Sequence, residues 1–182
     1  MIKCGITGSR GNLGVSFLKI KQFKFIIFDG DISKKSDVEK WIKLNDFDII
    51  VHFAALVPTY KVNRYYDKAL KTNFYGTKFL VDSIIKYKKN ISWFFFASSS
   101  HVYPFQRKKI LEKSKTKPLS KYGKTKLLAE NYIKLKFTNK NVSFCIGRIF
   151  SIFNNKNEGF FTPSLLHRIK KGPRNLILEN LN

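Results

Sequence analysis

With 182 residues, of which 43% are hydrophobic, the chain is long enough to bury the core of one globular domain, and no apolar run approaches the roughly 18 residues of a membrane span. The net charge of +23 invites a nucleic-acid-binding interpretation, but the excess is nearly all lysine spread along the chain, and arginine, the usual residue for bidentate contacts with bases and phosphates, is scarce. We therefore favour a basic, solvated surface over a nucleic-acid-binding site, and we expect no membrane binding.

Strand patterns and helix patterns alternate along the chain. The predicted strands are, in chain order, Lys3–Thr7, Phe23–Phe28, Asp48–Phe53, Ile91–Ala97 and Val142–Phe150, with the start of a further strand at Asn175–Leu178. The predicted helices between and after them are Leu13–Ile20, one beginning at a capping box of Ser36 and Glu39, Tyr66–Tyr87, Lys121–Phe137 and a short one at Pro163–Lys171. Strands this apolar must be covered on both faces. The expected fold class is α/β, a doubly wound parallel sheet with right-handed crossovers.

Cysteine usage and the first residues indicate the compartment. Cys4 and Cys145 lie in two predicted strands, so we expect two buried free thiols rather than a disulfide, and neither spacing suits a metal site. Met1–Lys3 lead directly into the first strand without a cleavage site, so no signal peptide is expected. The predicted location is cytoplasmic.

The turn after the first predicted strand is rich in glycine. Gly8 permits a turn that a Cβ would obstruct, Gly11 lets the backbone approach a pyrophosphate, and Gly14 lets the following helix pack against the sheet. The alternative is a strand-to-helix turn without a ligand, but the position directly between strand and helix favours a dinucleotide site. The residues expected to contact the dinucleotide here are Gly8, Ser9, Arg10, Gly11, Asn12, Leu13 and Gly14.

Acidic residues follow the second predicted strand. Asp29 ends that strand, where a carboxylate can accept hydrogen bonds from the adenosine ribose, and this favours NAD because a carboxylate repels a 2′-phosphate. Arg10 instead favours NADP, since a guanidinium can hold that 2′-phosphate. Asp31 and Ile32 are expected against the adenine. The alternative for both acids is turn chemistry around Gly30.

Tyr122 and Lys126 stand four residues apart on a predicted helix and therefore share one face. A phenol has an ordinary pKa of about 10, and a nearby ammonium lowers it, which gives an acid or base usable near neutral pH. In a lysine-rich chain such a pair also arises by chance. A serine-rich turn, Ala97–Pro104, follows the fourth predicted strand, where a serine can orient a reacting oxygen towards the tyrosine. Local capping is the alternative for these serines, and His101 is interpreted as a loop residue.

Six segments occur in the order and spacing of one known family. They are the glycine loop, Val51–Ala55, Asn73–Thr77, the turn ending Val102–Pro104, the pair Tyr122 and Lys126, and Arg148–Phe150. Over about residues 1–155 the chain resembles the NAD-dependent epimerase/dehydratase family, the extended short-chain dehydrogenase/reductases. Features of its dTDP-4-dehydrorhamnose reductase and GDP-fucose synthetase branches are both present.

The resemblance implies a Rossmann fold and a role for each matching residue. Tyr122 is then the acid or base, Lys126 its activator and the ribose anchor, and Ser99 the catalytic hydroxyl. Asn73 supports the lysine and the nearby backbone, and Ala54 and Ala55 line the cofactor together with the loop residues, Asp31 and Ile32. The family usually has asparagine at Ser151 and Tyr-Gly at Phe153-Asn154, so substrate choice is open.

The resemblance also predicts organisation and activity. Family members carry a second lobe, so we expect an NAD(P)-binding Rossmann domain at 1–158 and the beginning of a truncated substrate lobe at 159–182. The implied function is an NAD(P)-dependent nucleotide-sugar epimerase, dehydratase or reductase of polysaccharide biosynthesis, with NAD favoured over NADP. The alternatives are a truncated or split chain that only binds dinucleotide, and a basic nucleic-acid-binding protein. The partners are a nucleotide-sugar and either a homodimer mate or a chain that supplies the missing lobe.

Overall fold

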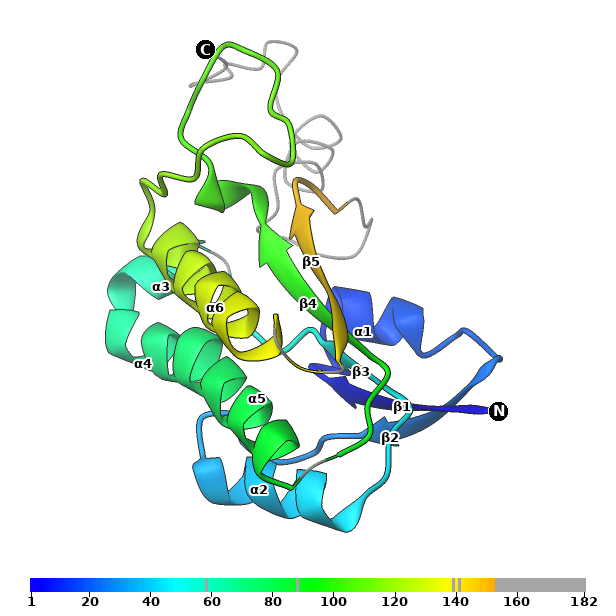
Figure 1. The fold of residues 1–182 in the computed structure, drawn as a ribbon. Helices are drawn as coiled ribbons and strands as arrows, with labels where there is room; N and C mark the ends of the chain where they lie inside the picture. The colour runs from blue at the N-terminus through cyan, green and yellow to red at the C-terminus, as the bar shows by residue number, and fades with distance from the viewer. Residues whose placement is uncertain (58, 88, 139, 141, 153–182) are drawn as a thin grey trace, which may run out of the picture. The chain divides into compact units, whose positions relative to one another are not determined.

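The sheet contains five strands, which all run parallel in the order β2-β1-β3-β4-β5 (Figure 1). This computed structural model describes residues 1–57, 59–87, 89–138, 140 and 142–152. The chain divides into two units, Met1–Phe150 and Ser151–Asn182, and every element named below belongs to the first. The strands are β1 (Ile2–Thr7), β2 (Phe23–Ile27), β3 (Ile49–His52), β4 (Trp93–Ser99) and β5 (Ser143–Ile149).

Helices cover both faces of this sheet, as a doubly wound arrangement requires. Figure 1 shows α2, α5 and α6 on one face and α1 on the other. The α-helices are α1 (Asn12–Phe17), α2 (Lys35–Leu44), α3 (Thr59–Arg64), α4 (Tyr66–Leu70), α5 (Gly76–Lys86) and α6 (Lys121–Phe137). Two other helical segments are the π-helical η1 (Lys71–Tyr75) and the 3₁₀ turn η2 (Ser100–Val102).

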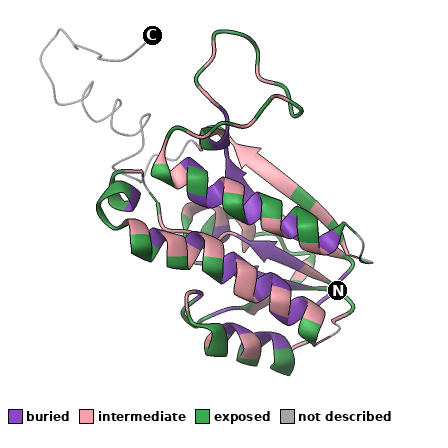
Figure 2. Ribbon diagram, turned by 60° about the vertical axis from the view of Figure 1, so that its left-hand side comes forward, coloured by how far each residue is buried: buried purple, intermediate pink, exposed green. Residues whose placement is uncertain are grey.

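The larger core lies under α2, α5 and α6. Fully buried aromatic residues of β4, Phe94 and Phe96, pack there with Ile50 of β3 and with Leu80 of α5. Burial is concentrated on the inner sides of these helices (Figure 2). The core on the other face is smaller, with Cys4, Ile6 and Val51 covered in part by α1. This fold confirms the predicted class.

The strand order reverses between β1 and β3, because the chain leaves β1 towards β2 and later returns to place β3 on the other side of β1. In open parallel sheets, ligands bind at the carboxyl ends of the strands beside such a reversal. The glycine loop after β1, the segment after β3 and the serine turn after β4 all lie at this edge.

Several sequence expectations were wrong in detail. The second helix begins at Lys35 with Lys34 as its N-cap and no side-chain cap, so Ser36 and Glu39 form no capping box, and the Ser36 hydroxyl donates to Asp37 instead. The first helix ends at Phe17 rather than Ile20. Cys145 is exposed, because it lies on β5, the last strand of the described sheet, where no described element covers it.

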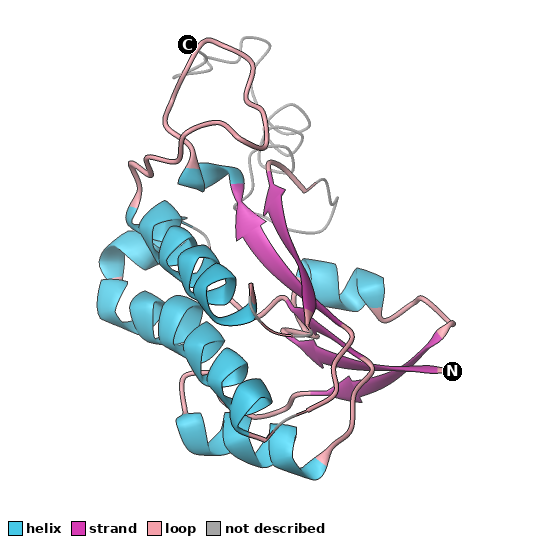
Figure 3. Cartoon of the chain, viewed as in Figure 1, coloured by secondary structure: helices cyan, strands magenta, loops and turns pink. Residues whose placement is uncertain are grey.

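The helix predicted over Tyr66–Tyr87 is a continuous run of α4, η1 and α5 with a π-helical middle turn (Figure 3). Helix α3, just before it, was not predicted. Among the described residues, no helix combines the length and apolar character needed to cross a membrane. The predicted domain boundary at residue 158, the helix at Pro163–Lys171 and the strand at Asn175–Leu178 lie outside the described residues.

Candidate functional site

The loop between β1 and α1 contains three glycines, and two of them determine its shape. Gly8 has a φ of +73°, and a Cβ there would lie 2.5 Å from the Ala54 nitrogen. A Cβ on Gly14 would lie 2.3 Å from the Gly8 carbonyl oxygen, so Gly14 packs closely against the loop itself. At Gly11 the nearest atom to a Cβ would be 3.4 Å away, an ordinary contact. The chain's own packing therefore requires glycine at positions 8 and 14, but not at 11.

This loop forms one wall of a groove, and the end of β2 forms the other. Eight of the ten residues that line it were predicted to bind cofactor, and Phe28 and Gly30 were not. The lining residues are Gly8, Ser9, Arg10, Gly11, Phe28, Asp29, Gly30, Asp31, Ile32 and Ala54. Six other predicted cofactor residues lie outside this groove: Asn12, Leu13, Gly14, Ala55, Asn73 and Lys126.

Arg10 and Asp29 form an ion pair at the mouth of the groove. Their side chains are 87% and 75% exposed, so the pair contributes little to stability. Each residue was predicted to influence the choice between NAD and NADP in opposite directions. Their contact means that the guanidinium partly neutralises the carboxylate that would repel a 2′-phosphate.

Asp31 makes a local turn as well as lining the groove. Its carboxylate accepts hydrogen bonds from the Ser33 backbone nitrogen at 2.9 Å and from the Ser33 hydroxyl at 2.7 Å. These bonds hold the pKa of Asp31 below its ordinary value. Ile32 is buried, and its side chain and carbonyl oxygen lie so close to Gly76 that a Cβ there would be 2.9 Å from both. The turn chemistry that was the alternative for Asp31 is thus present in the structure.

A buried hydrogen-bond relay begins behind the glycine loop. The Thr7 hydroxyl lies 2.6 Å from His52 Nδ1, and His52 Nε2 lies 2.9 Å from the Thr77 hydroxyl. Thr7 also accepts from the Ala54 nitrogen at 3.3 Å. Burial, with the charge of Lys126, lowers the pKa of His52 to about 3, so the imidazole is neutral at physiological pH.

Asn73 continues this relay from the π-helical turn. Its side-chain oxygen accepts from the Leu56 nitrogen at 2.6 Å, while its amide nitrogen donates to the Leu56 oxygen and, at 3.1 Å, to the Thr125 hydroxyl. Thr125 in turn donates to the Tyr122 carbonyl oxygen at 2.8 Å. Asn73 therefore fixes the segment after β3 to α6, the helix that carries Tyr122. The resemblance implied that Asn73 supports the active-site lysine and nearby backbone, and its bonds here are with the Leu56 backbone and with Thr125, the neighbour of Lys126 in the chain.

Tyr122 and Lys126 lie on the face of α6 that packs on β4. The N-cap of this helix is Ser120, whose hydroxyl accepts from the Gly123 nitrogen at 3.0 Å. Lys126 is buried, and its Nζ donates to the Ala97 carbonyl oxygen at 2.7 Å. The same Nζ lies 5.9 Å from the centre of the Tyr122 ring. Burial lowers the pKa of Lys126 to about 7, against an opposing effect of Glu130.

The expected acidification of Tyr122 is not found. Burial raises the pKa of Tyr122 to about 12, and a hydrogen bond with Ser99 only partly offsets this. The physical reason is that Lys126 directs its ammonium at the Ala97 carbonyl rather than at the phenol. The phenol is therefore protonated at neutral pH.

Ser99 and His101 lie beside Tyr122. The buried Ser99 hydroxyl accepts from the His101 nitrogen at 3.2 Å. The His101 ring meets the Tyr122 ring edge-on at 5.7 Å between centroids, and its Nδ1 lies 3.2 Å from the Ser120 hydroxyl. Sequence reasoning treated His101 as a loop residue and missed this contact. The backbone of His101 also packs closely on α6, since a Cβ on Gly123 would lie 2.1 Å from the His101 carbonyl oxygen.

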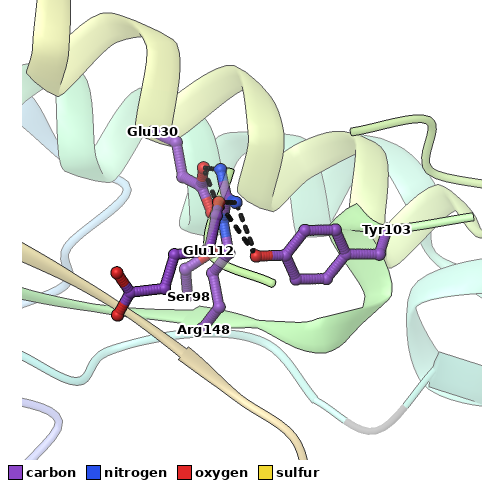
Figure 4. Close-up of polar contacts among 5 residues, drawn as sticks. All are labelled: Ser98, Tyr103, Glu112, Glu130 and Arg148. Carbon is purple, nitrogen blue, oxygen red and sulfur yellow. Dashed lines mark hydrogen bonds and ion pairs between the residues drawn. The ribbon is translucent and has the colours of Figure 1, made fainter. Parts of the chain in front are cut away.

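A second charged residue of α6, Glu130, is fully buried and was also missed. Arg148 of β5 binds its carboxylate through Nε and Nη2, and the Ser98 hydroxyl donates to the same carboxylate (Figure 4). Arg148 also donates to the Tyr103 hydroxyl at 2.8 Å and to the Glu112 carbonyl oxygen at 3.1 Å. The signal for Glu130 was its spacing, since Tyr122, Lys126 and Glu130 recur every four residues.

Comparison with known proteins gives this geometry a context. Residues 7–182 match the NAD dependent epimerase/dehydratase family model. UDP-glucose 4-epimerase 3 of Oryza sativa subsp. japonica is 34% identical over 108 residues, which cover 58% of this chain and 28% of the rice protein. The structure of a dTDP-4-dehydrorhamnose reductase from Clostridium acetobutylicum is 27% identical with a TM-score of 0.79, covering 93% of this chain and 60% of that one.

A third similar protein, MoeE5 solved in complex with UDP-glucose and NAD, shares the fold with a TM-score of 0.76 at 21% identity, covering 91% of this chain and 60% of that one. The chain thus spans less than a third of the rice relative and about 60% of each of these two solved chains. The family match extends over nearly the whole of this chain, and the fold agrees with the solved relatives. The chain belongs to the NAD dependent epimerase/dehydratase family.

Proposed function

We propose that this chain supplies the dinucleotide-binding and proton-transfer part of an NAD(P)-dependent nucleotide-sugar epimerase, dehydratase or reductase. The observation that carries the proposal is the meeting of Ser99, Tyr122 and Lys126 at the carboxyl end of β4, on the edge of the sheet that also bears the glycine-loop groove. The family match and the reductase and epimerase relatives support the same reaction class.

The groove fits the adenosine and pyrophosphate of a dinucleotide. Gly11 is the glycine that the chain's own packing does not require, and its open side leaves room for a pyrophosphate to approach the backbone. Phe28 and Ile32 offer apolar surface to an adenine, with Asp29 beside the ribose. A bound nicotinamide dinucleotide supplies a hydride acceptor and donor. The protein's own part is to hold it and to move the proton.

The proton transfer is assigned to Tyr122. Its raised pKa keeps the phenol protonated at neutral pH, which is the form that donates a proton to a carbonyl oxygen during reduction. The Ser99 hydroxyl, already hydrogen-bonded to the phenol, orients that oxygen. Lys126 is the ribose anchor, and turning its ammonium from the Ala97 carbonyl towards a ribose would also bring positive charge nearer the phenol.

The substrate class follows from the relatives rather than from the described residues. The rice relative is named for UDP-glucose, and MoeE5 was solved with UDP-glucose. The many lysines suit a substrate that carries a diphosphate. We therefore assign a nucleotide-sugar as the substrate. The assignment applies to a chain as long as these relatives, which extend beyond the matched residues.

The test is a turnover assay. Residues 1–182, and the same residues within a chain of the relatives' full length, are assayed with NAD or NADP against UDP-, GDP- and dTDP-sugars. We expect the long form to convert at least one sugar nucleotide, and the Tyr122→Phe variant of that form to convert none. Equal turnover by the Tyr122→Phe variant would remove the proposed acid. A long form that binds cofactor but converts nothing would support a chain that only binds dinucleotide.

A further inference from the structure

Three contacts join α6 to the end of β4. Three consecutive residues of the strand each meet one of Tyr122, Lys126 and Glu130 on the helix. The Ala97 carbonyl oxygen accepts from Lys126, and the Ser98 hydroxyl donates to Glu130. The Ser99 hydroxyl bonds Tyr122. The proposed function uses the first and third of these contacts and leaves the second, at Glu130, without a role.

Glu130 carries a full charge in a place without solvent. Its side chain is 0% exposed, and it lies one helical turn beyond Lys126, which is also buried. Burying a carboxylate is costly unless it is paired and hydrogen-bonded. Arg148 supplies the pairing with Nη2 at 2.7 Å and Nε at 3.0 and 3.2 Å from the carboxylate oxygens.

Arg148 is itself fixed from a second side. Its Nη1 donates to the Tyr103 hydroxyl, in the serine turn, and to the Glu112 carbonyl oxygen, in the loop that follows that turn. Its guanidinium carbon lies 4.8 Å from the centre of the Tyr103 ring. Figure 4 shows these contacts converging on Arg148, with the Glu112 carboxylate directed away from them. Glu130 is thus locked in place by groups from β4, β5 and this loop.

We propose that Glu130 is a positioning residue, whose carboxylate keeps the buried Lys126 side chain charged where it bonds the Ala97 carbonyl of β4. This inference rests on the proposed function at one point, the role of Lys126 as the ribose anchor. The locked carboxylate provides the negative charge on α6 next to an ammonium that burial would otherwise discharge. The effect of Glu130 on the pKa of Lys126 has this sign, since it opposes the lowering by burial.

Among the described residues, the other groups near Lys126 do not supply that charge. His52 on β3 is neutral, Tyr122 is a neutral phenol, Phe96 and the Ala97 carbonyl of β4 are uncharged, and Arg148 on β5 is positive. Lys126, Glu130 and Arg148 together carry one net positive charge. Replacing the glutamate with glutamine would leave the positive charges of Lys126 and Arg148 without this negative one, which favours loss of the lysine proton.

The experiment measures the charge of Lys126 directly. The full chain is labelled with ¹³C and ¹⁵N at the ends of its lysine side chains, and the Lys126 signal is assigned by its loss in Lys126→Met. Its titration is then followed by NMR from pH 5 to 10 in the wild type, Glu130→Gln and Glu112→Gln. Glu112→Gln is the matched control, because it removes a nearby carboxylate while keeping the carbonyl that Arg148 binds.

We expect the wild-type midpoint near the pKa of about 7 and an unchanged midpoint in Glu112→Gln. In Glu130→Gln the midpoint should fall by about one pH unit. A merely structural role predicts the opposite direction, because loosening α6 would admit water and raise the midpoint towards the ordinary 10.5. An unchanged or raised midpoint in a folded Glu130→Gln chain overturns the proposal.

A second readout follows from the first and uses the cofactor. With a midpoint about one pH unit lower, affinity for NAD(P) at pH 7 should fall about fivefold and recover near pH 5, where Lys126 is charged in both proteins. A loss of affinity that is equal at both pH values contradicts the charge argument. If the wild type binds neither dinucleotide, the proposed function fails, while the comparison of midpoints still decides the role of Glu130.

If Glu130→Gln does not fold, the wild type provides the test. The carboxyl ¹³C signal of Glu130, assigned through Glu→Gln variants at the other glutamates, should change with the same midpoint as Lys126. A Glu130 signal that shows no step at the Lys126 midpoint would show that the two charges are not coupled, and would overturn the proposal.

Discussion

The two ends of the candidate site are built in different ways. The groove beside β1 and β2 is shaped mainly by backbone, with Gly8 and Gly14 setting its close approaches and with its charged side chains, Arg10 and Asp29, in solvent. At the β4 and α6 end the charged side chains of Lys126 and Glu130 are buried and hydrogen-bonded. Backbone shape therefore determines the structure of the groove, and buried charged side chains determine that of the β4 and α6 end. Substitutions at the two ends should have different consequences.

The largest effect is expected at Tyr122. Tyr122→Phe keeps the ring and removes only the hydroxyl, so turnover by a chain of the relatives' full length should fall at least about 1,000-fold. Cofactor affinity should stay within about twofold, because the phenol is not part of the groove. Steady-state rates and calorimetric titration of the same preparation check both statements. A parallel loss of rate and affinity would mean that Tyr122 holds the cofactor instead.

The glycine loop offers a matched pair of substitutions. Gly14→Ala places a Cβ 2.3 Å from a backbone oxygen and should lower the free energy of unfolding by about 2–3 kcal/mol. Gly11→Ala meets only an ordinary contact, so stability should change by less than about 0.5 kcal/mol. Its dinucleotide affinity should nevertheless fall at least about tenfold, because the new methyl group occupies the pyrophosphate's approach.

Urea unfolding curves and titrations of the two variants separate these outcomes. Normal dinucleotide affinity in a folded Gly11→Ala chain would place the pyrophosphate elsewhere.

Acid stability depends on the buried His52. Its folded pKa of about 3 lies below the ordinary 6.5, so the unfolded chain binds a proton that the folded chain excludes. Above pH 6.5 this group contributes no pH dependence, and below it stability falls by about 1.4 kcal/mol per pH unit. His52→Asn has no such proton. The unfolding free energy of this variant should therefore vary less between pH 6.5 and 4 than that of the wild type. Equal slopes of unfolding free energy against pH in the two proteins would show that His52 is protonated in the folded chain.

The smallest effect is expected at the exposed ion pair. With Arg10 neutralising Asp29, we expect NAD to bind only a few-fold more tightly than NADP. Asp29→Asn should remove that preference, Arg10→Ala should increase it, and neither should change stability by more than about 0.5 kcal/mol. Competition titrations of the two dinucleotides measure the ratio. A wild type that prefers NADP would show that Arg10 outweighs Asp29.

The sequence predicted the features that depend on spacing. Apolar runs that alternate with helix patterns predicted all five strands of the described sheet. The glycine spacing predicted the turn in which Gly8 adopts a positive φ. The four-residue interval of Tyr122 and Lys126 correctly placed both on one face of α6, which packs on β4. These features follow from local periodicity, which a single sequence contains.

Features that depend on tertiary surroundings were not predictable in this way. The π-helical turn that places Asn73 has no local signature in the chain. The expected effect of Lys126 on Tyr122 was wrong because Lys126 bonds the Ala97 carbonyl instead and burial raises the pKa of the phenol, and spacing reports neither. Cys145 is exposed because of its place at the last described strand, and His101 and Glu130 gained their contacts only when β4 and α6 came together.

The measurement that tests the central proposal most directly is a calorimetric titration of the folded chain, residues 1–182, with NAD and with NADP, alongside Lys126→Ala and Gly11→Ala. We predict saturable binding of both dinucleotides, with NAD a few-fold tighter, and weaker binding in both variants. The absence of binding of either dinucleotide at about millimolar concentration, with circular dichroism showing a folded chain, would contradict the account. Binding that both variants leave unchanged would contradict the placement of the site.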